Sequence, residues 1–216
     1  MSTGVRPLTS LVAWAVLLCG LWLWARELTG GAGANWLDTG PREGRAETVR
    51  EDELPPPRAP LPGRAAPEAV TVASVGVAAE VVPRGLDADG GVEPPPYESP
   101  ELVAWYADGV PPGAEGAAVL VGHLDTERAP AVFHELAEAE PGDEVRVARA
   151  DGREAVFTVD GVDVVDRDAF DADRVYGQRT PGAAELRLLT CGGAYDPAGG
   201  GYAANVVVSA YLTDAG

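Results

Sequence analysis

A single cysteine outside the apolar N-terminus, Cys191, closes an apolar stretch and is followed by two glycines. The stretch Glu185–Thr190 has the length and composition of a strand, whose side chains alternate between two faces. A Gly-Gly pair directly after the cysteine allows a sharp turn and leaves room for another chain to approach the sulfur. This arrangement suits a thiol nucleophile at a strand end. The same stretch is also compatible with a small buried apolar cysteine.

A histidine at the end of a second predicted strand offers the acid–base group that such a thiol requires. His123 follows the apolar residues Ala117–Val121 and one glycine. A free cysteine has a pKa of about 8.5, so its thiolate is scarce at neutral pH. A neighbouring imidazolium would lower that pKa and later protonate a leaving amine. Taken alone, a histidine after a glycine is more often an ordinary loop or core residue.

The elements that must position these two side chains are mostly short strands. The clearest is a hairpin at Asp151-Gly152, because both residues tolerate positive φ between two alternating runs. The pattern predicts a mainly β fold of about seven or eight short strands with few helices, at the spacing of a closed or half-closed β-barrel. The predicted strands are Val70–Val77 with one change of phase, Ala117–Val121, Glu144–Ala150, Arg153–Val159, Val162–Val165, Glu185–Cys191 and Asn205–Leu212. The expected short helices are Glu101–Ala107 and Ala131–Glu138.

The N-terminal part of the 216-residue chain differs from the rest. Leu8–Ala25 is apolar and uncharged, with tryptophans near its ends, which predicts a transmembrane helix as an N-terminal membrane anchor over residues 1–26. A cleaved signal peptide is the alternative. Residues 27–68 are polar and rich in Pro and Gly, so a disordered stalk is expected. Residues 69–216 form the predicted catalytic domain, held outside the cell by a single-pass anchor in the cell membrane.

The net charge argues against a nucleic-acid-binding protein, and the number of cysteines excludes a fold held together by disulfides. The net charge is −18, which argues against nucleic acid as a partner because phosphate binding needs a basic surface. The two cysteines are Cys19, within the apolar N-terminal run, and Cys191. An exported domain would therefore hold Cys191 alone, which excludes a disulfide framework and suggests either a reactive thiol or an intermolecular bridge.

In this order and spacing, the motifs resemble the sortases, and most closely the class F sortases of actinobacteria. The resemblance covers residues 70–212, and its specific parts are the Gly-His and Thr-Cys motifs. The matching segments are Trp105-Tyr106, Pro112-Gly113, Ala118–Asp125, Pro130–Phe133, Pro141–Val145, Val175–Gly177, Leu186–Gly193, Tyr202 and Asn205–Val208.

The resemblance implies a mainly β fold, a closed sortase-type β-barrel of about eight strands with short helices. It also implies a cysteine transpeptidase that needs no metal or organic cofactor. Such enzymes cleave a Leu-Pro-X-Thr-Gly sorting signal of surface proteins between Thr and Gly. Cys191 would attack the Thr carbonyl and form a thioacyl enzyme, with His123 as acid or base. An amine of a peptidoglycan precursor would then release the product, which anchors the protein to the cell wall. The enzyme is expected to be monomeric.

One departure from the family pattern concerns a missing cation. Sortases carry an arginine on the strand after the cysteine, whereas no Arg or Lys follows Cys191 here. Arg187, on the Cys191 face of the predicted strand, and Arg128, close after His123, are candidate replacements. Tyr202 and Asn205 are neutral hydrogen-bond donors on the following strand, and Asp125 is either a partner of the imidazole or a turn residue.

Three functions therefore stay open at the level of the sequence. The first is an active transpeptidase. The second is a catalytically impaired sortase-fold module that binds sorting-signal or wall peptides, because the arginine is absent. The third is a hydrolase that passes the acyl group to water.

Overall fold

The computed structural model describes residues 54–88, 90–196 and 201–216. The predicted membrane anchor at 1–26 and the first part of the predicted stalk, at 27–53, lie outside the described residues. Within the described ranges, no helix combines the length and apolar character needed to span a bilayer.

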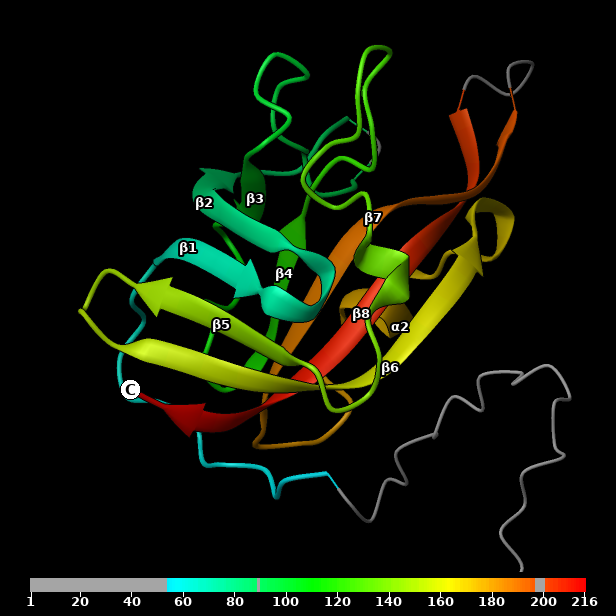
Figure 1. Ribbon diagram of the computed structural model, residues 1–216. Coiled ribbons are helices and arrows are strands. Elements are labelled where there is room, and N and C mark those ends of the chain that lie inside the picture. Colours follow the sequence, from blue (N-terminus) through cyan, green and yellow to red (C-terminus); the bar gives the residue numbers. More distant parts are fainter. Residues whose placement is uncertain (1–53, 89, 197–200) are drawn as a thin grey trace, which may run out of the picture. The chain divides into compact units, whose positions relative to one another are not determined.

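Eight strands form a closed barrel in the order β1-β2-β3-β4-β7-β8-β6-β5 (Figure 1), which confirms the predicted mainly β barrel. Two neighbouring pairs, β2 with β3 and β4 with β7, run parallel, and the other pairs are antiparallel. The strands are β1 Pro67–Val72, β2 Val77–Arg84, β3 Val103–Tyr106, β4 Gly116–Val121, β5 Glu144–Arg149, β6 Glu154–Asp166, β7 Ala184–Asp196 and β8 Gly201–Ala215. In the described part of the chain the helices are three single 3-10 turns, Ala73–Val75, Leu136–Glu138 and Arg167–Ala169, and the short α2, Ala172–Tyr176.

The first predicted strand, Val70–Val77, is in fact two strands joined by a tight turn. Val72 of β1 pairs with Val77 of β2, and Gly76 between them has a φ of 67°. That left-handed conformation favours glycine, which has no Cβ to clash. The change of phase in the sequence therefore marks a reversal of the chain and not a bulge.

The predicted helix Glu101–Ala107 is also wrong, because its centre forms β3. This strand lies between β2 and β4, and its first three residues, Val103 to Trp105, are buried. Pairing on both edges satisfies the backbone and outweighs local preference. The predicted helix Ala131–Glu138 is reduced to turns and one 3-10 turn, although Phe133 and Leu136 do point into the core.

The hairpin at Asp151-Gly152 is confirmed. It joins β5 to β6, with Glu144 opposite Thr158, and Gly152 has a φ of 78°. Strand β6 then continues through Gly161 to Asp166, so that Arg153–Val159 and Val162–Val165 belong to one strand with a register shift at Gly161.

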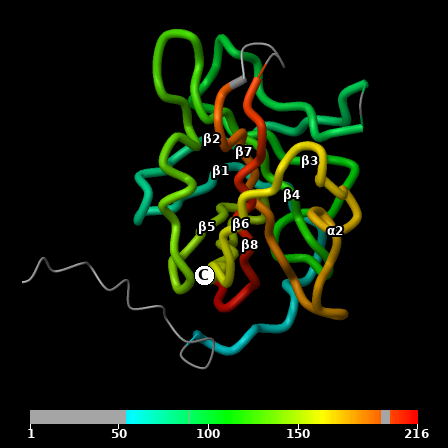
Figure 2. Tube along the Cα trace, turned by 90° about the vertical axis from the view of Figure 1, so that its right-hand side faces the viewer, coloured from blue at the N-terminus to red at the C-terminus, as the bar shows by residue number. Residues whose placement is uncertain are grey.

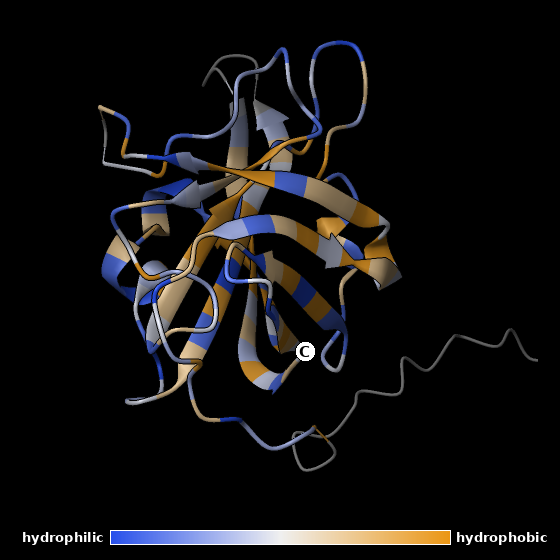
Figure 3. Ribbon diagram, turned by 90° about the vertical axis from the view of Figure 1, so that its left-hand side faces the viewer, coloured by the Kyte–Doolittle hydropathy of each residue, from blue (hydrophilic) through white to orange (hydrophobic). Residues whose placement is uncertain are grey.

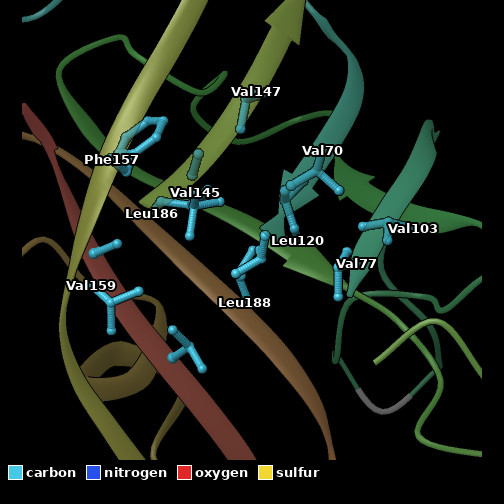
Figure 4. Close-up of a cluster of buried hydrophobic side chains, with 14 of the residues drawn as sticks. Val70, Val77, Val103, Leu120, Val145, Val147, Phe157, Val159, Leu186 and Leu188 are labelled. Atoms are coloured by element: carbon cyan, nitrogen blue, oxygen red, sulfur yellow. The ribbon is translucent and has the colours of Figure 1, made fainter. Parts of the chain in front are cut away.

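Alternating strand residues fill the barrel with apolar side chains (Figure 4). Hydrophobic and hydrophilic residues alternate along several of the strands (Figure 3). Leu120, Leu186 and Leu188 are fully buried there beside Phe157. A second buried cluster lies on the outer side of β4, β7 and β8 under α2, and its members are Val92, Val119, Val175, Leu189 and Val207. The outer face that carries Leu189 is thus partly covered, which matters for the residues that follow it on β7.

The described end of the predicted stalk lies against the barrel. The Arg58 amide donates to the Leu212 carbonyl at 2.7 Å, and the Leu61 amide donates to the Gly113 carbonyl at 2.7 Å. The Leu61 side chain belongs to the core, and β1 begins at Pro67. The predicted disordered stalk over 27–68 is therefore corrected over this last part, because apolar and backbone contacts attach it to the folded domain.

Candidate active site

The parallel pairing of β4 and β7 brings the two predicted functional residues to one end of the barrel. Val121 is in register with Leu189, and the Gly122 amide donates to the Leu189 carbonyl at 3.1 Å. His123 and Cys191 each lie two residues beyond this pair. Because neighbouring strands are about 4.8 Å apart, the register places the histidine and the cysteine on adjacent chain segments.

Cys191 lies within β7 and not at its end. It is opposite Asn205 of β8, and the two strands continue side by side to Asp196 and Gly201 (Figure 2). The predicted sharp turn at the two glycines is instead a shift in register after Gly192. A Cβ at Gly192 would lie 2.8 Å from Val206 Cγ2 and 3.2 Å from the Val206 amide nitrogen, so a larger residue would force β8 or the valine side chain to move. The cysteine side chain is exposed.

The surroundings of Cys191 favour the neutral thiol. The residue is exposed as a whole, but neighbouring atoms desolvate the sulfur, and this raises the pKa of the thiol above its ordinary value. The positive charge of Arg167 acts in the opposite direction, and the carboxylate of Asp125 raises the pKa further. At neutral pH the sulfur therefore carries its proton, and attack on a carbonyl requires a base to remove it.

The imidazole of His123 is held on two sides by the segment that precedes β3. Its Nε2 lies 2.6 Å from the Pro95 carbonyl oxygen, and its ring stacks on Tyr97 with centroids 4.3 Å apart. A carbonyl oxygen only accepts hydrogen bonds, so Nε2 carries a hydrogen and Nδ1 is the remaining acceptor. His123 is only 6% exposed, and within the described ranges its side chain shares no hydrogen bond with Cys191.

Asp125 is engaged by a tyrosine of β8. The Tyr202 hydroxyl donates to the Asp125 carboxylate, and this hydrogen bond is the main reason that the pKa of Tyr202 is raised to about 12. The Tyr202 ring also meets Tyr195 edge to face at 5.3 Å. Asp125 therefore links the segment after His123 to β8, and the carboxylate orients the tyrosine and not the imidazole.

Neither arginine suggested by the sequence lies at the thiol. Arg187 does share the outer face of β7, but it is 1% exposed and its guanidinium donates to Glu185 at 2.5 Å and to the carbonyls of Val175 and Gly177. Arg128 lies in an exposed loop, where its backbone amide donates to a threonine hydroxyl. Arg187 is a structural residue under α2, and among the described residues no hydrogen bond or ion pair joins the Arg128 side chain to Cys191 or His123.

Arg167 is the cation that the sequence analysis missed. It follows β6 directly, and Asp166 before it pairs with Ala204, the neighbour of the residue opposite Cys191. Its charge acts on the Cys191 thiol. No motif connects positions 167 and 191, because their proximity depends on the registers of two strand pairs. Among the described residues, no group of three or more His, Cys, Asp or Glu side chains is arranged to hold a metal ion.

The protein is a closed eight-stranded barrel in which a cysteine and a histidine lie on adjacent parallel segments. Residues 70–213 match the sortase domain family, and the chain belongs to the sortase family. The sortases are a family of known cysteine transpeptidases. No curated protein matches the sequence.

Solved sortases share the fold at low sequence identity. Sortase A from Corynebacterium diphtheriae aligns with a TM-score of 0.50 and 16% identity, covering 70% of this chain and 62% of its own. Sortase C1 from Streptococcus agalactiae gives 0.52 and 19%, covering 68% of this chain and 66% of its own. Sortase C-1 from Actinomyces oris gives 0.50 and 19%, covering 68% of this chain and 72% of its own. The chain thus spans slightly less than two thirds of the length of the first two.

Proposed function

We propose that this protein is a class F sortase that cleaves a Leu-Pro-X-Thr-Gly-like sorting signal and transfers the cleaved protein to a cell-wall amine. The observation that supports the proposal is the register of β4 with β7, which brings the segment that carries His123 next to the segment that carries the exposed Cys191. The assignment to class F rests on the resemblance of the matching segments over residues 70–212 to the class F sortases. With it we propose a membrane tether within residues 1–26 and a catalytic domain outside the cell.

In the proposed reaction, Cys191 is the nucleophile and His123 is the acid and base. The thiol proton passes to Nδ1 of His123, the acceptor left by the Nε2–Pro95 hydrogen bond. The sulfur then attacks the Thr carbonyl, and the imidazolium protonates the departing Gly amine. In the second half, an acceptor amine attacks the thioester and the thiolate leaves. Stacking on Tyr97 limits rotation of the imidazole and keeps Nδ1 in one direction.

A specific observation also supports the second candidate, a module that binds sorting-signal or wall peptides without turnover. The thiol pKa of Cys191 is raised by burial, and no Arg or Lys follows Cys191 in the chain. Both features reduce the thiolate available for chemistry and the positive charge available to an oxyanion.

One experiment separates these functions. The full-length chain in detergent, carrying Cys19→Ala so that Cys191 is the single thiol, is incubated with a Leu-Pro-X-Thr-Gly peptide with and without an amine acceptor. Intact-mass spectrometry is expected to show a thioacyl adduct that disappears when amine is added, with formation of the amide product. Cys191→Ala and a peptide with Leu and Pro exchanged are the controls and should give no adduct.

Each of the other results contradicts the proposal in a different way. Peptide binding without an adduct would identify the binding module. Release of free acid in the presence of excess amine would identify a hydrolase. Absence of both binding and adduct, in a chain that is folded by circular dichroism, would remove the sorting signal as the substrate.

A further inference from the structure

A carboxylate lies close to the proposed nucleophile and works against it. Asp125 follows His123 by two positions, and the segment that carries both lies beside the β7 segment that carries Cys191. Two positions of an extended chain span about 7 Å. The negative charge of Asp125 raises the pKa of the Cys191 thiol, which opposes formation of the thiolate. The first half of the proposed reaction therefore gives no reason for a carboxylate at this place.

The contact between Asp125 and Tyr202 spans β7. Strand β7 lies between β4 and β8 in the barrel. Asp125 comes from the β4 side, and Tyr202, which donates its hydroxyl to the carboxylate, belongs to β8. The hydrogen bond therefore crosses β7 in the stretch after Cys191, which begins with Gly192 and Gly193. Strand order and a side-chain contact thus hold the carboxylate beside the part of β7 that follows the nucleophile.

A tight loop fixes the backbone of Asp125. The residue pairs with Pro130 in an isolated bridge. Between them, the Thr126 amide donates to the Ala129 carbonyl at 2.8 Å, and the Thr126 hydroxyl accepts from the Ala129 amide at 3.2 Å. The chain returns to the core at Phe133, which is fully buried. The folded backbone therefore sets the position of the carboxylate.

The carboxylate of Asp125 keeps one oxygen available. The Tyr202 hydroxyl donates to Oδ2, and Oδ1 has no hydrogen-bond partner among the described residues. The charge of Arg167 also acts on the sulfur, but neither this arginine nor another basic side chain in the described ranges forms an ion pair with Asp125. Asp125 is half-buried, so water screens its charge less than that of an exposed residue. Such a carboxylate attracts a cation from solution.

An exposed aromatic ring lies next to this carboxylate. Tyr195 is opposite Tyr202 on β7, and the two rings meet edge to face with their centroids 5.3 Å apart. Tyr195 is 61% exposed, so its ring is open to a ligand. The face of an aromatic ring attracts a cation. The carboxylate of Asp125 and the ring of Tyr195 together suit a primary ammonium group.

We propose that Asp125, Tyr195 and Tyr202 form the subsite that receives the acceptor as a primary ammonium ion, a role that rests on the proposed transpeptidase function. His123 is neutral once it has protonated the departing Gly amine, so it takes one proton from the bound ammonium. The nitrogen then attacks the thioester carbon and the N–C bond forms. As the C–S bond breaks, the sulfur takes a second proton from the nitrogen. A charge that hinders the first half of the reaction thus serves the second.

The first test requires no sorting signal. Cys191 is modified by aminoethyl methanethiosulfonate, which carries a primary ammonium, and by the neutral methyl methanethiosulfonate. In both reactions the thiolate forms a disulfide with the reagent and methanesulfinate leaves. The ratio of the two rates measures the attraction of a cation, because a change in the thiol pKa affects both rates equally. All variants carry Cys19→Ala in the full-length chain in detergent.

Asp125→Asn removes the charge but keeps an acceptor for the Tyr202 hydroxyl. We expect it to lower the ratio of the two rates about 10-fold, as the loss of a hydrogen bond to a charged group does. Tyr195→Leu should lower the ratio about 3-fold, through loss of the aromatic face. The control is Glu127→Gln, which removes the same charge from an exposed position of the same loop and should leave the ratio unchanged.

The second test follows the acceptor itself. The thioacyl enzyme formed with a Leu-Pro-X-Thr-Gly peptide is offered butylamine, which is an ammonium ion at neutral pH, or hydroxylamine, which is mostly uncharged. The ratio of kcat/KM for butylamine to kcat/KM for hydroxylamine should fall about 10-fold in Asp125→Asn. The loss should appear mainly in the KM for butylamine, because the charge binds the acceptor.

Several results overturn the proposal. One is an unchanged reagent ratio in Asp125→Asn, and another is an equal fall in Glu127→Gln, which a general surface charge would cause. A lower reagent ratio without a lower acceptor ratio also overturns it, because the acceptor then does not use the cation site. A thermal melt reports folding, and if Asp125→Asn unfolds, the ratio in Tyr195→Leu decides.

Failure of the proposed function gives a different result. If the wild-type chain forms no thioacyl adduct with the peptide, the transpeptidase function fails, and the acceptor role of the subsite fails with it. The reagent ratio in Asp125→Asn then shows separately whether an ammonium site lies beside Cys191.

Discussion

Replacing Arg187 by methionine tests whether this arginine holds the fold or takes part in the chemistry. Arg187 and Glu185 are 1% and 2% exposed, and their side chains meet at 2.5 Å. The guanidinium also donates to the carbonyls of Val175 at 3.2 Å and Gly177 at 2.9 Å, which fixes α2 and the residue after it on β7. Methionine has a similar length and no charge, so the substitution leaves Glu185 buried without its main partner.

The magnitude follows from that burial. Removing one partner of a buried ion pair costs about 3–5 kcal/mol. We expect the lower end, because the amides of Arg179 and Thr180 still donate to the Glu185 carboxylate, at 3.0 and 2.7 Å. For a domain of this size, about 3 kcal/mol corresponds to a fall in Tm of about 6–12 °C. Urea unfolding and thermal melts followed by circular dichroism measure both quantities.

The loss should depend on pH. Burial alone would raise the pKa of Glu185, but the hydrogen bonds from Arg187 and from the two backbone amides outweigh it and lower this pKa below the ordinary 4.5. A lowered folded-state pKa means that the stability from this carboxylate is fully present above pH 4.5 and is lost as the pH falls through the folded-state value. The difference between wild type and Arg187→Met should therefore be largest near neutral pH and shrink in acid.

Two comparisons make the prediction sharp. The double variant Glu185→Gln/Arg187→Met removes the buried charge and should regain much of the lost stability. Arg58→Met breaks the exposed pair with Asp214 and should cost less than about 1 kcal/mol. An Arg187→Met protein with unchanged Tm but a strongly reduced rate of peptide acylation would refute the structural role and return Arg187 to the active site.

Two further predictions concern the titration of groups at the site. Because desolvation raises the pKa of Cys191, its alkylation by iodoacetamide should reach half its maximal rate above pH 9.0, and a midpoint near neutrality would contradict the described surroundings of the sulfur. Because the hydrogen bond to Asp125 raises the pKa of Tyr202 to about 12, Asp125→Asn should move one tyrosine from that value toward the ordinary 10.0 in an ultraviolet absorbance titration. Tyr202→Phe serves as the control that assigns the transition, and an identical titration curve in Asp125→Asn would show that the carboxylate does not hold the tyrosine.

Local signals allowed part of the fold to be predicted. The Asp151-Gly152 hairpin was identified correctly because both the turn and the alternating runs are encoded within a short stretch. The β3 strand was not, since its pairing with β2 and β4 depends on distant segments. The same limit applies at Gly76. A reversal of the chain and a bulge give similar sequence patterns, so the sequence did not show that β1 and β2 are two separate strands.

The candidate site shows the same division. The alternation along β7 correctly placed Arg187 on the face of Cys191, but it gave no sign that α2 covers that face. Arg167 was missed for a related reason, since two successive strand registers are needed to align β6 with β7. The choice between Asp125 as imidazole partner and as turn residue required the position of Tyr202, which comes much later in the chain.

The parallel neighbours β4 and β7 also determine when the site comes into existence during folding. Strands β5 and β6 and helix α2 all lie between β4 and β7 in the chain. Pairing β4 with β7 therefore closes a long loop, and this pairing forms slowly compared with the β5/β6 hairpin. In a nascent or partly folded chain, the segments that carry Cys191 and His123 are therefore not yet adjacent. Pulsed labelling of Cys191 during refolding would report the moment at which the barrel closes.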